Sequence, residues 1–316
     1  MNKSKLLVIF SVLLFNLVGF QKITAEAQSF SGTQSPIFFQ KLSELFSSSL
    51  PAHENIFLPI VYDEDDLPLI EVKIEDNVYS LLIDLGSYAQ ISLDEEILEK
   101  INKKPYGIAK FEDFQGSRYK SEKYLIPEIR IGNTIFAEVI AKGENKDFKK
   151  KIVLWESPDH SPSKLGGKVG RNLLKRKNIF LDFLNSRMAF VEKVDSLKSL
   201  NFPDNFLAIP FEITSLGITL KIKTDIGEKK FILDSGSTLS AIRASQYRNL
   251  ACQKGENGLN YFTSSQFIIG NRSFDEIRLH LLDIAAVEQV DGVLGMDFMR
   301  HHAFYIDFRK KTLHIK

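Results

Sequence analysis

The chain has 316 residues, of which 44% are hydrophobic and 26% are charged, so it can bury a substantial core. Its 41 lysines and arginines nearly balance its 40 aspartates and glutamates, and net charge therefore gives no reason to expect nucleic acid as a partner. The single cysteine, Cys252, excludes an intramolecular disulfide and suits a bacterial periplasm or surface better than a disulfide-stapled extracellular domain.

The first residues are typical of an export signal. Lys3 and Lys5 precede an apolar run over 6–20, and Ala25-Glu26-Ala27 follows as a small-x-small cleavage pattern. We therefore predict a signal peptide over 1–27 and an exported protein, periplasmic or secreted. An uncleaved membrane anchor is the alternative, but the run is short for a span. No stable membrane span is expected after cleavage.

Residues 28–56 are predicted to form an N-terminal linker and helix. The stretch 28–35 is small and polar, and Ser35-Pro36 then precedes apolar residues at helical spacing as far as Phe46. This helix either packs on the surface of the protein or acts as a prosegment that covers a cleft.

Two segments of the chain share one strand-to-turn pattern. In each, an apolar run is followed by Asp, one further residue, Gly and Ser: the first copy is 81–87 and the second is 231–237. A single copy would be read as a β-turn. The second copy, and the apolar runs that precede both, indicate strands that deliver Asp84 and Asp234 to turns that a glycine allows to bend sharply.

The duplication extends beyond this pattern. Ile131-Gly132-Asn133 recurs as Ile269-Gly270-Asn271, and 167–174 aligns without a gap on 292–299. A repeat of half a chain predicts two homologous lobes. We expect them at 57–192 and 206–316, joined by a polar linker over 193–205.

These motifs resemble the aspartic peptidases, both the two-lobed pepsin type and the retroviral type. The shared pattern is Asp-Thr/Ser-Gly after an apolar strand, then an apolar-apolar-Gly triplet, once in each lobe; Asp234-Ser235-Gly236 with Val293-Leu294-Gly295 fits it fully. The resemblance covers about residues 57–316, and the end of the second lobe is most similar to bacterial members. It implies a mostly β, bilobal pepsin-like acid-protease fold with an interlobe cleft and a flap hairpin.

The resemblance also implies a catalytic pair, Asp84 and Asp234. Two carboxylates within hydrogen-bonding distance share one proton, so one can act as general base on a water while the other protonates the scissile carbonyl. This chemistry needs no metal and no other cofactor. Support for the pair is expected from five neighbours, namely Gly86, Ser87, Ser235, Gly236 and Ser237.

Each supporting residue has an expected role. The two glycines let the turns of the two lobes approach closely, and the hydroxyls of Ser87 and Ser237 are expected to bond the outer carboxylate oxygens. In the family, the hydroxyl residue after each Asp grips the opposite turn, as Ser235 can. Leu85 cannot do so, and Lys168 stands where the family has an apolar residue, so the first lobe departs from the pattern twice.

A hairpin over 111–119 is the candidate flap. It has a glycine at its tip and aromatic residues on either side, so Phe114, Gly116 and Tyr119 are expected to contact an extended peptide. An ordinary surface hairpin is the alternative. The first lobe also has an extra stretch over 143–163, either a loop that helps to choose substrates or a solvated charged loop.

The sequence thus predicts an exported aspartic endopeptidase, monomeric, acting on peptides or proteins. It has no Gly-x-Ser-x-Gly motif, and its histidines lack zinc-type spacing. The alternative is a weak or inactive relative that binds peptides or a partner protein, which Leu85 and Lys168 favour. A third interpretation is a half-active chain that dimerises through its second repeat.

Overall fold

The computed structural model describes residues 56–112, 118–144, 166–246, 252–255, 258–283 and 290–316. The chain divides into two compact units, 1–55 and 56–316, and the second unit holds all the described residues. The predicted signal peptide, the predicted N-terminal helix, the tip of the candidate flap with Phe114 and Gly116, and nearly all of the stretch 143–163 lie outside the described residues.

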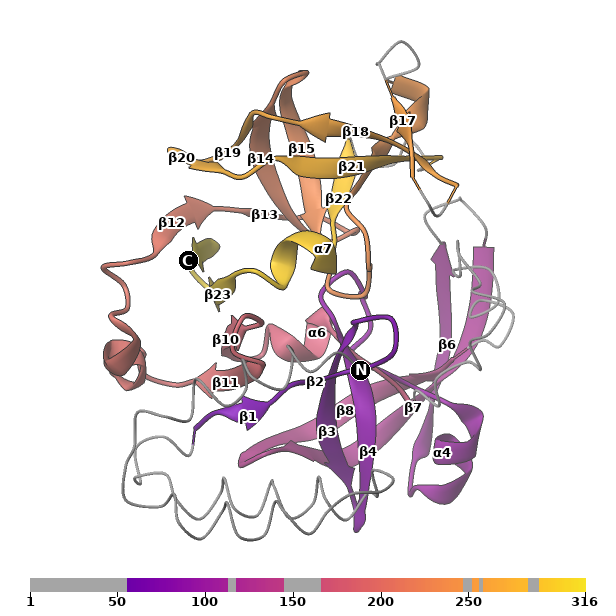
Figure 1. The fold of residues 1–316 in the computed structure, drawn as a ribbon. Helices are drawn as coiled ribbons and strands as arrows, with labels where there is room; N and C mark the ends of the chain where they lie inside the picture. The colour runs from indigo at the N-terminus through magenta and orange to yellow at the C-terminus, as the bar shows by residue number, and fades with distance from the viewer. Residues whose placement is uncertain (1–55, 113–117, 145–165, 247–251, 256–257, 284–289) are drawn as a thin grey trace, which may run out of the picture. The chain divides into compact units, whose positions relative to one another are not determined.

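An eight-stranded sheet forms the core of the first lobe (Figure 1). Its order is β2 (Val61–Tyr62), β3 (Pro68–Ile74), β4 (Asn77–Asp84), β9 (Gly167–Gly170), β5 (Ile91–Leu93), β8 (Thr134–Gly143), β7 (Arg118–Ile131) and β6 (Lys104–Glu112). Strand β9 runs parallel to β4 and antiparallel to β5, so the chain inserts a late strand beside the one that ends at Asp84.

A ten-stranded sheet forms the second lobe, and its strands repeat the order of the first. The path is β17 (Gln253–Lys254), β18 (Asn260–Ser264), β21 (Ile277–Leu282), β16 (Ala241–Arg243), β22 (Gly292–Leu294), β15 (Gly227–Leu233), β14 (Ile218–Thr224), β19 (Phe267–Ile269) and β20 (Arg272–Phe274), with β13 (Glu212–Ile213) on β14. Strand β22 lies parallel to β15 just as β9 lies parallel to β4. The sequence repeat is therefore a repeat of topology.

Both halves of the chain contribute to a third, six-stranded sheet. Its order is β1 (Leu58–Pro59), β11 (Arg187–Val191), β10 (Asn178–Asp182), β23 (Ala303–Asp307), β24 (Thr312–Ile315) and β12 (Leu207–Pro210). The halves meet where β10 pairs with β23, with Ile179 opposite Ile306. This shared sheet joins the two lobes.

The helices in the described residues are short. They are α4 (Glu95–Lys100), α6 (Arg171–Leu174), α7 (Met296–Met299) and the 3-10 helices η2 (Val194–Leu200) and η3 (Ala244–Gln246). None of them has the length and apolar character that crossing a bilayer requires.

Alternation of side chains explains why these segments form strands. In β3, Ile70, Val72 and Ile74 are buried while Glu71 and Lys73 are exposed, which is the period-two pattern of a sheet with one face on a core. Strand β14 repeats the pattern in the second lobe. The apolar faces of both sheets belong to one continuous buried cluster.

The segment expected to be a polar linker is attached more firmly than its composition suggests. It contains η2, and Leu197 and Phe202 are buried in a small apolar cluster of their own. The Phe202 ring packs edge-on against Tyr305 of β23, with centroids 4.8 Å apart. Leu200 of η2 packs against the same cluster, so a few apolar residues without strand periodicity dock the segment.

Candidate active site

The two candidate catalytic aspartates stand at equivalent places in the two sheets. Asp84 ends β4, directly opposite Gly170 of the parallel strand β9, and Asp234 follows β15, whose last residue, Leu233, lies opposite Leu294 of β22. Both aspartates are buried, at 6% and 7% exposure. Flanking strands therefore fix both carboxylates at the ends of buried, apolar segments.

The glycine of each turn lies against the carboxylate of the other. A methyl group built on Gly86 would lie 2.4 Å from the Cγ of Asp234, and one built on Gly236 would lie 2.8 Å from the Cγ of Asp84. Any side chain larger than hydrogen would overlap the carboxylate at either position. The structure thus brings together Asp84 and Asp234, predicted as a pair from sequence, and explains both glycines by close approach.

Ser235 connects the two turns. Its buried hydroxyl donates a hydrogen bond to Ile83 O over 2.6 Å and accepts one from Leu85 N over 3.0 Å. These bonds are the cross-lobe grip expected of Ser235. One serine thereby bonds both the carbonyl of the residue before Asp84 and the N–H of the residue after it.

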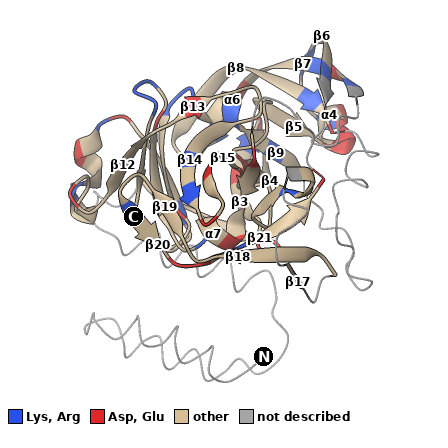
Figure 2. Ribbon diagram, turned by 90° about the horizontal axis from the view of Figure 1, so that it is seen from above, with Lys and Arg blue, Asp and Glu red and all other residues tan. Residues whose placement is uncertain are grey.

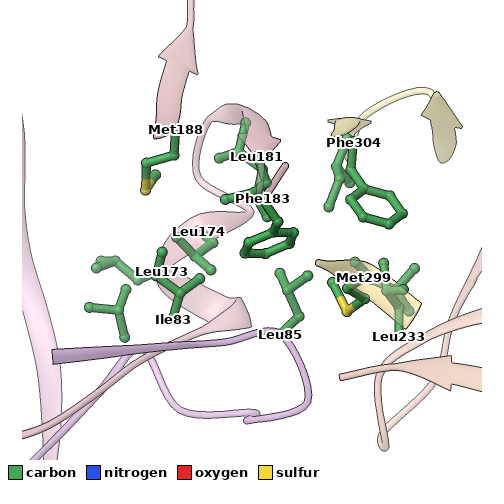
Figure 3. Packing of buried hydrophobic residues seen from close by; sticks show 14 of the residues in the cluster. Ile83, Leu85, Leu173, Leu174, Leu181, Phe183, Met188, Leu233, Met299 and Phe304 are labelled. Carbon is green, nitrogen blue, oxygen red and sulfur yellow. The ribbon is translucent and has the colours of Figure 1, made fainter. Parts of the chain in front are cut away.

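Leu85 occupies the position where a reciprocal hydroxyl would stand. Its side chain is fully buried in the apolar cluster that also contains Phe183, Leu233 and Met299 (Figure 3). The apolar contacts of Leu85 therefore stand in place of a second pair of cross-lobe hydrogen bonds.

The hydrogen bonds to the two carboxylates differ from those expected. Asp84 Oδ1 accepts a bond from the backbone N–H of Ser87 at 2.7 Å, and Asp234 Oδ1 accepts one from the backbone N–H of Gly236 at 2.9 Å. The Ser237 hydroxyl instead donates to Leu239 O at 2.9 Å, and the Ser87 hydroxyl accepts from Ala89 N at 3.4 Å. Each carboxylate therefore accepts a hydrogen bond from a backbone amide of its own turn, where a serine hydroxyl was expected.

Lys168 makes an ion pair with Asp84. Its Nζ lies 3.1 Å from Asp84 Oδ2, and the two side chains are only 17% and 8% exposed. Burial by itself would lower the pKa of Lys168, but attraction by Asp84, with smaller contributions from Glu144 and Asp234, outweighs burial and raises it. The sequence marks Lys168 as a departure from the family, but nothing in it indicates that Lys168 reaches the aspartate.

Asp234 has a strongly altered acidity. Burial raises its pKa to about 7, and the nearby charge of Asp84 adds to this effect, while the Gly236 N–H and Lys168 oppose it. The raised pKa favours the protonated form of Asp234, beside an Asp84 that is paired with a cation. The two carboxyl groups are not equivalent.

A second lysine, Lys142, lies in the same row of the sheet as Lys168, where a row means residues paired side by side across neighbouring strands. Ser92 of β5 faces Lys168 of β9 on one side and Lys142 of β8 on the other. Burial lowers the pKa of Lys142, although Glu144 and Asp84 favour its charged form. Sequence reasoning missed this row, because only the order of the strands brings the residues side by side.

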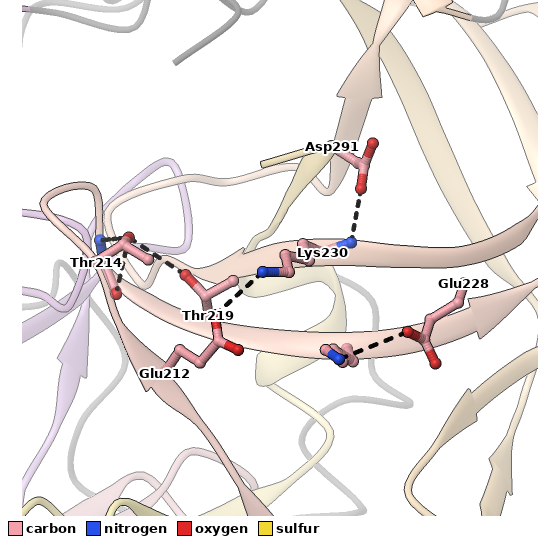
Figure 4. Close-up of polar contacts among 8 residues, drawn as sticks. Glu212, Thr214, Thr219, Glu228, Lys230 and Asp291 are labelled. Carbon is pink, nitrogen blue, oxygen red and sulfur yellow. Dashed lines mark hydrogen bonds and ion pairs between the residues drawn. The ribbon is translucent and has the colours of Figure 1, made fainter. Parts of the chain in front are cut away.

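Arg171 ties the first lobe to a turn of the second. It is buried, begins α6, and its Nη2 donates to Ser215 O at 3.0 Å and to Thr214 O at 3.4 Å. The Thr214 side chain in turn bonds Gly217 and Thr219, which shapes the turn between β13 and β14 (Figure 4). No motif or periodicity around Arg171 indicates this role.

The second lobe makes a contact of the same kind in the other direction. Arg300, just after α7, pairs with Asp66 in the turn between β2 and β3, at 2.7 Å. Strands β2 and β3 occupy the places in the first lobe that β13 and β14 occupy in the second. Each lobe therefore holds the corresponding turn of the other through an arginine.

The predicted flap hairpin is formed by β6 and β7. Phe111 pairs with Tyr119, and Glu112 with Arg118, which brings the strands together up to the tip. The two strands are basic and carry Lys104, Lys110, Lys120 and Lys123 (Figure 2). Of the residues expected to contact a peptide, Tyr119 lies in β7, and the tip lies outside the described residues.

The groups available for chemistry at this site are carboxyl, hydroxyl and ammonium groups. The described residues contain no group of three or more His, Cys, Asp or Glu side chains placed to hold a metal ion.

Comparison with known proteins identifies the fold. No family model matches the chain, and no curated protein matches its sequence. Among solved structures, the aspartic proteinase from Irpex lacteus is similar, with a TM-score of 0.55 and 15% identity, over 82% of this chain and 96% of that one. Identity this low carries information on the fold alone. The chain has the mostly β, bilobal fold of a pepsin-like aspartic proteinase.

Proposed function

We propose that the protein is an aspartic endopeptidase whose catalytic groups are Asp84 and Asp234. The observation that carries the proposal is the mutual approach of the two turns, in which each aspartate carboxylate lies against the glycine of the other lobe. Fold alone would not support an activity, because folds are shared by proteins of unrelated function. The two carboxyl groups that the turns bring together at this point of the fold do support it.

In the proposed reaction, Asp84 removes a proton from a water, and the resulting oxygen nucleophile forms a bond to the carbonyl carbon of the scissile peptide. Asp234 gives its proton to the carbonyl oxygen, so a neutral tetrahedral diol forms. Collapse of the diol breaks the C–N bond as the amine leaves with a proton from the dyad. The proton of one diol hydroxyl passes to the dyad as the carboxylic acid product forms. The dyad then holds one proton, as it did at the start.

The surrounding residues take supporting roles in this proposal. Ser235, Gly86 and Gly236 hold the two turns at the required separation, and the backbone amides of Ser87 and Gly236 orient the carboxylates. The hairpin of β6 and β7, with Tyr119, would cover an extended peptide. We further propose that the protein is exported, periplasmic or secreted, and acts as a monomer on peptides or proteins.

A second candidate function is a peptidase-like protein that binds peptides or a partner protein without cutting them. The ion pair between Lys168 and Asp84 favours it, because a cation on a carboxylate reduces the basicity available to activate water. The apolar Leu85 in place of a gripping hydroxyl favours it as well.

The test is cleavage of a mixed peptide library between pH 3 and pH 8 by the wild type, Asp84→Asn and Asp234→Asn. The exposed Asp195, which pairs with Lys198 on the surface, provides the control Asp195→Asn. Cleavage by the wild type and the control, but by neither dyad variant, is the expected result. Retention of peptides without cleavage would favour the binding protein, and loss of cleavage only in Asp234→Asn would favour a dimer built on the second lobe.

A further inference from the structure

We infer that Lys168 divides the roles within the dyad, because its ammonium group holds Asp84 as the carboxylate and so places the shared proton on Asp234. Asp84 is then the base and Asp234 the acid in every turnover. The assignment of these roles rests on the proposed peptidase function. The placement of the proton is a property of the folded protein and can be tested without a substrate.

Geometry gives the dyad its asymmetry. Lys168 lies opposite Leu82 on the strand next to the one that carries Asp84, and its Nζ reaches Asp84 Oδ2 at 3.1 Å. In the second lobe, Val293 lies opposite Ile232 in the same relationship to Asp234. The corresponding position thus carries a cation in one lobe and an apolar side chain in the other.

Other charged groups around the pair preserve this arrangement. Lys168 also interacts with Glu144, which follows β8, and with Asp234 across the lobes, while Lys142 of β8 lies near enough to interact with Lys168, Glu144 and Asp84. Two ammonium groups thus face two carboxylates, and charge balances when Asp234 is neutral. A second proton on the dyad, or none, would leave the buried group with net charge.

Two buried polar atoms nearby reinforce the polar character of this row. Ser92 Oγ, from the strand between the two lysines, and Glu144 Oε1 are both buried without a hydrogen-bond partner among the described residues. Both atoms can accept a hydrogen bond from an ammonium group or from a water. The two residues therefore provide polar acceptors beside Lys168, which favour the charged form of its ammonium group.

The physical consequence concerns two ionisations. A cation favours the charged form of any nearby carboxyl group, and it acts most strongly on the nearer one. Lys168 therefore lowers the pH at which the dyad loses its first proton more than the pH at which it loses its second. Without Lys168, both ionisations move to higher pH, the first by more, and the remaining proton is divided more evenly between the aspartates.

The first experiment measures melting temperature at pH 5 and needs no catalysis. Asp84→Asn leaves the Lys168 ammonium beside a neutral amide and should lower the melting temperature by several degrees. Asp234→Asn imitates a neutral carboxyl group and should change it much less. Adding Lys168→Met to Asp84→Asn should restore most of the loss. Equal losses in the two Asn variants, or no restoration in the double variant, would overturn the inference.

The second experiment follows the acid limb of the pH profile of kcat/KM on a cleaved library peptide. Lys168→Met should move the acid limb up by about 1 pH unit or more, the lower end of the shift that a neighbouring cation causes. Lys168→Arg keeps the positive charge and should leave the limb close to its original place. Lys221→Met is the control, since Lys221 is exposed and pairs with Glu228 of the neighbouring strand. An acid limb that stays in place in Lys168→Met would contradict the inference.

The two experiments separate the inference from the proposed function. Cleavage with equal losses of melting temperature in the two Asn variants would keep the peptidase and remove the role of Lys168. Unequal losses with restoration, but without cleavage at any pH, would keep the charge placement and remove the peptidase.

Discussion

Ser235 and Leu85 occupy equivalent positions in the two lobes, and only Ser235 bonds the other lobe through its side chain. The Ser235 hydroxyl accepts a bond from Leu85 N at 3.0 Å and donates one to Ile83 O at 2.6 Å. In the other direction, the Leu85 side chain offers apolar contacts. The two lobes are therefore joined at the dyad by hydrogen bonds on one side and by packing on the other.

Ser235→Ala is expected to destabilise the protein. It leaves two buried backbone groups, Ile83 O and Leu85 N, without their partner, and each such loss costs about 1–3 kcal/mol. Chemical denaturation should therefore show a drop of about 2–6 kcal/mol in the free energy of unfolding. Ser196→Ala is the control, because the Ser196 hydroxyl bonds Lys193 O on the surface. Equal effects of the two substitutions would show that the Ser235 bonds contribute little.

Leu85→Ala tests the packing on the other side of the site. Leu85 is fully buried, and removing a buried leucine to the Cβ costs about 2–5 kcal/mol, depending on how far the cavity collapses. The matched control is Leu184→Ala, since Leu184 is 63% exposed and should change stability by no more than about 0.5 kcal/mol. Similar free energies of unfolding for the two variants would mean that Leu85 has no special part in joining the lobes.

The sequence predicted the fold because the fold is repeated. Apolar runs such as those before Asp84 and Asp234 occur twice with the same turn, and this double occurrence is what indicates two lobes. The facing of the two turns and the grip of Ser235, which join residues far apart along the chain, were implied by the resemblance to the aspartic peptidases. The strands and turns themselves depend on residues close to one another in sequence, where periodicity and turn chemistry are informative.

Two of the contacts that sequence did not predict connect residues far apart along the chain. Lys168 reaches Asp84 only because β9 inserts beside β4, and Arg171 reaches Ser215 only because the two lobes meet. The expected bonds from the Ser87 and Ser237 hydroxyls to the carboxylates are replaced by other local bonds. The backbone N–H of Ser87 bonds Asp84, and the Ser237 hydroxyl donates to Leu239 O. The periodicity of the sequence does not indicate which partners these side chains bond.

The two glycines of the dyad can be tested with single methyl groups. Gly86→Ala places a Cβ 2.4 Å from Asp234 Cγ, so the carboxylate or the turn has to move, and proposed peptide cleavage should fall by at least about 100-fold, as misplacement by about 1 Å does elsewhere. Gly143→Ala is the control, because a methyl there meets ordinary contacts, the nearest at 3.5 Å. Full activity of Gly86→Ala would show that the carboxylates do not act at this separation.

The two cross-lobe arginines should differ in their contribution to stability. Arg171 is buried and donates to two backbone carbonyls, so Arg171→Met should cost about 1.5–3 kcal/mol, as expected for hydrogen bonds from a charged group. Arg300 is 35% exposed and Asp66 is 63% exposed, so Arg300→Met should cost no more than about 1 kcal/mol. Denaturation curves of the two variants at one pH provide the comparison, and a larger loss for Arg300→Met would contradict the assignment of the main cross-lobe contact to Arg171.

The protonation of Asp234 makes stability depend on pH in a defined direction. Its pKa in the folded protein is about 7, against 3.8 for an unperturbed aspartate, so the folded state binds the proton more tightly than the unfolded state. Unfolding between pH 4 and pH 7 therefore releases a proton, and the contribution of Asp234 to stability falls as pH rises through this range. The expected change is a few kcal/mol, on the order of 1.4 kcal/mol for each pH unit. Asp234→Asn has no such proton, so subtracting its free energy of unfolding from that of the wild type at each pH should isolate this decline. A difference that stays constant from pH 4 to pH 7, or that rises, would show that Asp234 is not the group that holds the proton.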